Sequence, residues 1–417
     1  MAVKWFSCYL KGRQSRTLFR NCLSSCRNIH TGVPQGAVTS PKLFNFYLYN
    51  LPPPPAGVDI VMYADDLSAY AVGPEVQILC DRINSYVPAL LQFFQERDLV
   101  VSSEKSSVTL FTPQPNQARD HPHISINNTI VPLDKQPKIL DVTHYTMYTF
   151  TPHCRIQAAK VRARSNILKA LAGTSWGQQK ETLLLTYQAL GRSVIDYAAP
   201  VWAPVINDTT WRYLQTAQNE ALRIATGCHK MSHADHLHLE TKLLPVKFHS
   251  ELLAKQYWLS CYQSHHPCHH LTSLPAPARN MKGNNEVAPL SEEGITDADI
   301  YRDCLRTLHS QAVTDARANF VPNRVLGASA PDISPLENLL PRSVRTTLAQ
   351  LRSGHCRLLN SYKACITSGI SDVCPECGVA PHSVEHLFNC RSNPTQLTAQ
   401  DLWDDPAAVA DFLNLDN

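Results

Sequence analysis

The stretch from Gly57 to Gly73, GVDIVMYADDLSAYAVG, is the part of the sequence from which the fold is best inferred. Residues 60–64 and 67–72 are apolar and rich in β-branched or aromatic side chains, which is typical of two paired strands. Asp65 and Asp66 then fall at the turn between them. Asp tolerates turn conformations and bonds its own backbone, so an ordinary hairpin tip is the alternative to a functional site.

Two adjacent carboxylates at a buried hairpin repel each other, which disfavours their joint ionisation unless a cation lies beside them. Mg²⁺ accepts carboxylate oxygens as ligands and takes its other ligands from water and phosphates. Asp65 and Asp66 are therefore candidate catalytic residues and Mg²⁺ ligands, with Mn²⁺ as the alternative ion.

A glycine-containing loop lies upstream, at residues 31–41 (TGVPQGAVTSP). Its two glycines flank a rigid Pro-Gln pair, and such a loop lets backbone approach a ligand closely. Ser40 is expected to be the N-cap of the next helix, with Pro41 at its first position. The helix would hold the loop in place.

The order of these motifs, GVPQG at 32–36 and then YADD at 63–66, resembles the palm of reverse transcriptases, most closely those of non-LTR (LINE-type, jockey-like) retrotransposons. The resemblance implies an RNA-directed DNA polymerase that uses two-metal nucleotidyl transfer, with Asp65 and Asp66 as two of its three metal-binding aspartates. It implies an RNA template, a DNA primer and deoxynucleoside triphosphates as partners. It also places three residues against the incoming nucleotide and template: Pro34, Gln35 and Gly36.

The resemblance carries further expectations. The family's first metal-binding aspartate lies on a separate palm strand after the fingers, so we expect the chain to begin within the palm and to extend no primer by itself. Lys105, in a predicted strand over 99–111, is a candidate for the nucleotide phosphates, with an exposed solvated lysine as the alternative. At 138–142 the family usually shows Leu-Gly-Val, and Asp141 stands in place of the glycine.

The sequence predicts an α+β fold: a partial right-hand polymerase palm, built from an antiparallel hairpin sheet with helices, then a helical thumb and a small zinc-knuckle module. The predicted divisions are a palm over 1–150, a thumb and connection over 151–262, a Pro-rich linker with one or two short helices over 263–340, and a basic helix, zinc knuckle and acidic tail over 341–417.

The first thumb helix is predicted to bury one apolar stripe and to expose its cations elsewhere. These cations suit nucleic-acid phosphates, although a solvated helix face explains them equally. The stripe comprises Ile156, Ala159, Ala163, Ile167 and Leu171, and the cations are Lys160, Arg162, Arg164 and Lys169.

Near the C-terminus the spacing C-x2-C-x8-H-x3-C predicts a zinc site. Two thiolates on a tight turn, followed by His and Cys one helical turn apart, can complete a tetrahedral Zn²⁺ shell. The predicted ligands are Cys374, Cys377, His386 and Cys390, with His382 as an alternative to His386. Many LINE-type polymerases carry a similar knuckle, which implies RNA binding.

Charge is unevenly distributed in the 417-residue chain, whose formal net charge is only +3. Residues 1–51 carry seven Lys or Arg and no acid, residues 341–366 are also basic, and 393–417 carry five Asp and no base. This pattern favours a polyanionic partner over a membrane surface. With scattered cysteines, no secretory signal and no long apolar span, we expect an intracellular protein of the cytoplasm or nucleus. The alternative to a polymerase is a non-catalytic nucleic-acid-binding protein that uses its basic helices and knuckle.

Overall fold

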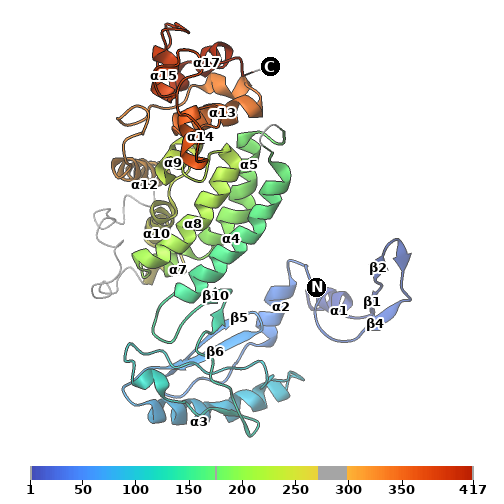
Figure 1. Cartoon of the computed structure of the whole chain (residues 1–417). Helices are drawn as coiled ribbons and strands as arrows, with labels where there is room; N and C mark the ends of the chain where they lie inside the picture. The colour runs from blue at the N-terminus through green and yellow to red at the C-terminus, as the bar shows by residue number, and fades with distance from the viewer. Residues whose placement is uncertain (1, 174–175, 271–297, 416–417) are drawn as a thin grey trace. The chain divides into compact units, whose positions relative to one another are not determined.

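The computed structural model describes residues 2–173, 176–270 and 298–415, so part of the predicted linker, 271–297, lies outside the described residues. The chain forms two compact units, residues 1–137 and residues 138–417, and each is described by itself (Figure 1). Among the described helices, none is both long and apolar enough to cross a membrane.

The first unit combines three helices with small two-stranded sheets. Its helices are α1 (Ala2–Leu10), α2 (Ser40–Tyr47), α3 (Val76–Gln95) and the short 3₁₀ turn η1 (Gln117–Arg119). Its antiparallel pairs are β1 (Arg13–Ser15) with β4 (Arg27–Ile29), β2 (Leu18–Phe19) with β3 (Cys22–Leu23), β5 (Val58–Tyr63) with β6 (Asp66–Ala71), and β7 (Ser125–Ile126) with β8 (Thr129–Ile130).

The β5–β6 hairpin and α3 form the core of this unit, as the alternating strands and the helical periodicity predict. Val58 is buried against Tyr86 and Leu90 of α3, and the alternate residues of both strands pack around them. Figure 1 shows α3 running beneath the hairpin. Tyr86 also donates a hydrogen bond to the Pro52 carbonyl, which anchors the proline-rich segment before β5.

The strand predicted over 99–111 is wrong. This segment is irregular apart from one isolated bridge between Val108 and Leu133. The side chains there favour a strand, but a strand needs a partner edge, and the structure offers only this single bridge.

The second unit is mainly helical. Its first elements are the hairpin β9 (Lys138–Ile139) and β10 (Val142–Thr143), α4 (Thr151–Leu171), α5 (Lys180–Tyr187), the π-turn η2 (Gln188–Arg192), α6 (Ser193–Asp196), α7 (Ala199–Trp202), α8 (Asp208–Thr226), α9 (Ala234–Thr241) and α10 (Val246–Cys261). They are followed by α12 (Ala298–Ala318), η4 (Pro335–Leu339), α13 (Arg342–Arg352), α14 (Asn360–Ile366), α15 (Val384–Asn389), α16 (Asp401–Asp404) and α17 (Pro406–Phe412). At 21 residues, α12 is longer than the short helices predicted there, and it packs on α10.

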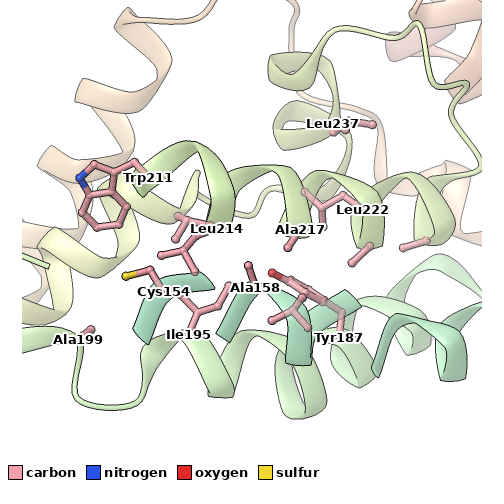
Figure 2. Close-up of a cluster of buried hydrophobic side chains, with 14 of the residues drawn as sticks. Cys154, Ala158, Tyr187, Ile195, Ala199, Trp211, Leu214, Ala217, Leu222 and Leu237 are labelled. Carbon is pink, nitrogen blue, oxygen red and sulfur yellow. The ribbon is translucent and has the colours of Figure 1, made fainter. Parts of the chain in front are cut away.

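Helices α4 and α8 pack side by side at the centre of the larger core of this unit. Figure 2 shows Leu214, Ala217 and Leu222 of α8 facing Cys154 and Ala158 of α4. Small residues on both helices allow this close approach. The buried face of α4 is therefore not the predicted stripe: Ile156 and Ile167 are 43% and 46% exposed.

The C-terminal part has a hydrophobic core of its own, which includes Leu348, Tyr362, Phe388, Leu402 and Trp403. The predicted acidic tail thus contributes α16 and α17 to a packed core.

The predicted basic helix is α13, and its arginines do not form an exposed basic face. Arg342, Arg345 and Arg352 are 7%, 4% and 0% exposed. Arg342 donates to the carbonyls of Ile224 and Ala225 at the end of α8. Arg345 pairs with Glu181, and Arg352 pairs with two buried glutamates. These partners, remote in sequence, bury the charges that composition alone assigned to the surface.

Candidate catalytic hairpin and metal centre

The tip of the β5–β6 hairpin carries the two candidate carboxylates. Tyr63 pairs with Asp66, so the connecting turn consists of Ala64 and Asp65, and Asp66 is the first residue of β6. Both carboxylates are exposed. Ala64 has a φ of +52°, a conformation in which a non-glycine residue is strained. Such strain recurs at functional sites, and here it shapes the turn that presents Asp65.

The two faces of the hairpin differ in character. Val58, Ile60 and Leu67 point toward α3. The strand register places Asp59, Tyr63 and Asp66 on the opposite face, since paired residues share a face and successive residues alternate. Tyr63 is 65% exposed, so this face is open to a ligand.

No third carboxylate joins Asp65 and Asp66 within the part of the chain that the structure describes, where the only group of three or more candidate metal ligands lies elsewhere. Asp59 shares a face with Asp66, but it pairs with Tyr70 at the other end of the strand. Asp59 lies four residues before Tyr63, the partner of Asp66, and four residues of extended strand span about 13 Å. The hairpin therefore offers two neighbouring carboxylates as candidate metal ligands.

A hydrogen bond from the start of α2 holds the Pro34-Gln35-Gly36 loop. Ser40 is buried and its hydroxyl donates to the Pro34 carbonyl over 2.6 Å. Gly36 has a φ of +84° and open space where a Cβ would stand, while Gln35 is exposed. The N-cap of α2 is Thr39, so the predicted cap Ser40 is wrong: it is the first helical residue, because its side chain binds the loop instead.

Lys105 is exposed in a turn whose backbone bonds Ser102. No other candidate site residue is described in contact with its side chain.

The residue in place of the family's glycine, Asp141, lies in a two-residue turn between β9 and β10. Leu140 and Asp141 have φ values of +45° and +65°. Lys138 lies 2.5 Å from the Asp141 carboxylate, and its hydrogen bond and charge lower the pKa of that carboxyl. Tyr197 also donates to the Leu140 carbonyl, over 2.9 Å. Asp141 therefore keeps a backbone conformation that glycine adopts without strain.

The four predicted zinc ligands converge at the C-terminal end of the chain. Their ligand atoms all lie within 4.8 Å of one another. Cys374 Sγ and Cys390 Sγ are 4.0 Å apart, and Cys377 Sγ is 3.3 Å from His386 Nε2. Tetrahedral Zn²⁺ with thiolate bonds of about 2.3 Å requires sulfur atoms about 3.8 Å apart, so this set fits the ion.

Local structure explains how the ligands are positioned. Cys374 and Cys377 flank a turn closed by Gly378 at a φ of +67°. His386 lies in the first turn of α15, which Ser383 caps, and Cys390 directly follows the helix. His382, the alternative ligand, is outside the group of four, and its Nδ1 accepts a hydrogen bond from the Asn360 N–H.

Sequence reasoning missed the N–H groups that prepare Cys377 as a ligand. Hydrogen bonds from the backbone at Ala380 and Val379 lower the pKa of the Cys377 thiol to about 6. A thiolate is the metal-binding form of cysteine. Gly378, which allows the backbone to turn back over the sulfur, is the sequence signal that could have predicted this arrangement.

The exposed side of α4 is the other surface that the sequence singles out. Arg162 pairs with Glu220, and Arg164 donates to the Leu190 carbonyl. Lys160 and Lys169 are exposed and have no carboxylate within 4 Å among the described residues. Lys160 lies on the same side of the helix as the two exposed isoleucines, whereas Lys169 lies on another side and donates to Asn166 Oδ1. The face therefore combines the two isoleucines with Lys160.

Comparison with known proteins shows which class the N-terminal part is similar to. Residues 2–163, which include the loop and the hairpin, match the family model described as reverse transcriptase (RNA-dependent DNA polymerase). This part of the chain is therefore similar to reverse transcriptases.

Curated relatives then narrow the class. The chain is 25% identical to the "Probable RNA-directed DNA polymerase from transposon X-element" of Drosophila melanogaster, over 57% of this chain and 26% of the relative. It is 25% identical to the "Probable RNA-directed DNA polymerase from transposon BS" of the same species, over 66% of this chain and 31% of the relative. It is 23% identical to the "RNA-directed DNA polymerase from mobile element jockey" of Drosophila funebris, over 52% and 24%. The resemblance to jockey-like, non-LTR reverse transcriptases is thus confirmed, and the match spans under a third of each of these relatives' length.

Proposed function

We propose that this chain is part of an RNA-directed DNA polymerase of a non-LTR retrotransposon, and that the β5–β6 hairpin is the metal-binding part of its palm. The observation that carries the proposal is the pair of exposed carboxylates at a strained hairpin tip, inside the segment that matches reverse transcriptases. Asp65 and Asp66 would hold Mg²⁺ or Mn²⁺; when bound, such an ion would lower the pKa of the primer hydroxyl and neutralise charge on the phosphates of the incoming nucleotide.

The other residues have supporting roles in this proposal. Pro34, Gln35 and Gly36 would position the nucleotide and template, because Gly36 leaves space for close approach and Gln35 is exposed. Lys105 would contact phosphate only if its turn lies near the bound nucleotide. The proposal keeps the divisions predicted from the sequence: a palm over 1–150, a thumb and connection over 151–262 and a linker over 263–340.

Helix α4 supports a thumb role on a specific observation. Ile156 and Ile167 stay exposed although α4 has a fully packed opposite face, and Lys160 lies between them in sequence. An apolar strip that carries an exposed cation suits the sugars and phosphates of an RNA template paired with a DNA primer.

The C-terminal group of three cysteines and one histidine would hold Zn²⁺ as a structural ion. All four positions are taken by protein ligands, which leaves no open position for catalysis. The second candidate function, a non-catalytic nucleic-acid-binding protein, rests on this centre and α4, since the arginines of α13 are buried.

Metal binding by the hairpin tests the proposal. Mn²⁺ binding to the full chain, measured by electron paramagnetic resonance with a deoxynucleoside triphosphate and a template–primer, should weaken at least tenfold in Asp65→Asn. Asp59→Asn is the matched control, because Asp59 lies on the same hairpin away from the tip. Equal Mn²⁺ affinity in Asp65→Asn and Asp59→Asn would contradict a metal site at the tip.

A further inference from the structure

A group of positively charged side chains surrounds His229 in the second unit, outside every site described above. It comes from segments far apart in the sequence: the end of α8, the loop after it, residues before η4, and the loop after α13. We call it the cationic cluster, and its members are Arg223, His229, Lys230, Arg324, His355 and Arg357.

Specific contacts hold these segments together. Arg223 donates to the Ser232 carbonyl over 3.1 Å, and the hydroxyls of Ser232 and Ser353 are 3.0 Å apart. Arg324 Nη1 lies 3.0 Å from His355 Nε2. Its aliphatic stem runs so close to Gly354 that a Cβ there would be 3.3 Å from Arg324 Cδ. The cluster is therefore a built feature of the fold.

Its charges are not neutralised by neighbouring acids. Among the described residues, no carboxylate lies within 4 Å of the Arg223, Lys230, Arg324 or Arg357 side chain. Glu220, the acid on the turn of α8 before Arg223, is paired with Arg162 instead. Burial lowers the pKa of His229, and the charges of Lys230, His355, Arg357 and Arg223 lower it further. The cluster thus has a net positive charge: Glu220 acts on Arg223, but none of the four side chains pairs with a carboxylate among the described residues.

Two buried polar atoms at the cluster, one on Arg223 and one on the neighbouring Tyr362, also have no hydrogen-bond partner among the described residues. Tyr362 on α14 is 4% exposed, its ring centroid lies 5.0 Å from that of His229, and its hydroxyl is buried and unpartnered. Arg223 Nε is also buried and has no hydrogen-bond partner among the described residues. A buried polar group without a partner is costly, so it indicates that a ligand or solvent normally reaches this place.

The cations of this cluster differ from the buried arginines of α13. Arg345 and Arg352 have glutamate partners within the fold, whereas Lys230, Arg324 and Arg357 are exposed and have none among the described residues. Exposed guanidinium and ammonium groups without acids suit the tetrahedral oxygens of phosphate.

We propose that the cationic cluster binds backbone phosphates of a single-stranded nucleic acid. This inference rests on the proposed function, in which the chain binds RNA and DNA, and it adds a contact remote from the hairpin in sequence. Its position beside α14, whose first residue bonds His382 of the zinc-knuckle region, would bring the strand close to that module.

Salt-dependent binding tests the proposal. A fluorescent single-stranded RNA oligonucleotide is titrated with the full chain between 50 and 200 mM salt, and anisotropy gives the affinity. Lys230→Gln with Arg357→Gln should lower the affinity at least tenfold at 50 mM salt. It should also reduce the slope of log affinity against log salt by about 1.4, which corresponds to two phosphate contacts on a single strand.

The matched control is Arg302→Gln with Arg306→Gln, which removes the same charge from exposed positions on α12. Its affinity should stay within twofold of the unchanged chain, and its salt slope should not change. A charge-preserving pair, Lys230→Arg with Arg357→Lys, should bind nearly as well as the unchanged chain.

The outcomes separate the two proposals. If the unchanged chain fails to bind RNA at low salt, the proposed nucleic-acid function itself is wrong. If it binds, and the cluster variant and the α12 variant bind alike, the inference about the cluster alone is overturned. Competition by polyglutamate as strong as by unlabelled RNA would also overturn it, since the site would then recognise an acidic peptide.

Discussion

Replacing Arg352 by Met should strongly destabilise the second unit. The Arg352 side chain is fully buried and bridges three elements. Its Nε lies 2.5 Å and its Nη2 3.0 Å from the two carboxylate oxygens of Glu240. Its Nη1 lies 2.6 Å from Glu337 and donates to the Leu402 carbonyl over 2.9 Å. Met has a similar length but makes none of these bonds.

The magnitude follows from what remains after the substitution. Glu240 would keep only Lys180 at 3.8 Å and His236 at 3.6 Å as cationic neighbours, in a place where its side chain is 1% exposed. Removing one partner of a buried ion pair costs about 3–5 kcal/mol because the other charge stays desolvated. We expect a loss of this size in the free energy of unfolding.

Urea unfolding followed by circular dichroism measures the effect. Arg317→Met is the matched control, because Arg317 pairs with Asp332 at 2.8 Å but both side chains are half exposed. That pair should contribute about 0–1 kcal/mol. A change below 1 kcal/mol in Arg352→Met would refute the reasoning that the unit depends on this buried pairing.

Three further predictions follow from the structure. Cys390→Ser should abolish binding of one equivalent of Zn²⁺, measured by metal analysis, yet leave the helical circular dichroism largely intact, because most of the adjacent hydrophobic core comes from residues outside the ligand-bearing helix α15. Asp141→Gly should leave stability unchanged or raise it by up to about 1 kcal/mol in thermal unfolding, since glycine adopts the φ of +65° freely; a marked loss would show that the Lys138 contact matters more. Burial lowers the pKa of His153 to about 4 in the folded chain, below the value near 6.5 that it has in the unfolded chain. Between these two pH values only the unfolded chain protonates His153, so the free energy of unfolding should fall as the pH falls from about 6.5 to about 4. His153→Gln should flatten this dependence, and an unchanged slope would exclude His153 as its source.

Local patterns predicted the parts of the fold whose contacts are close in sequence. The β5–β6 hairpin and α3 follow from alternating and helical periodicity, and the four metal ligands follow from their spacing. In each case the side chains concerned lie within one hairpin, one helix or one short loop–helix segment.

Long-range packing could not be predicted in the same way. Helix α4 carries apolar residues on two faces, and the buried face is the one that packs against α8 and the neighbouring helices of this core. The arginines of α13 looked exposed because Arg352 is separated from Glu240 by more than 100 residues. The segment 99–111 has strand-forming side chains without a partner strand, which no local pattern reveals.

The contact between α13 and α8 has a consequence for synthesis of the chain on the ribosome. The carbonyls of Ile224 and Ala225 are bonded by Arg342, and the buried Glu240 is neutralised largely by Arg352. More than 100 residues of translation separate the making of α8 from the emergence of α13, a delay of about 5–20 s at common elongation rates. During that interval α8 has uncovered carbonyls and Glu240 lacks its main counter-charge. The end of α8 and helix α9 are therefore expected to stay loosely packed until α13 arrives, which makes them the part of the nascent unit that a chaperone would bind in this interval.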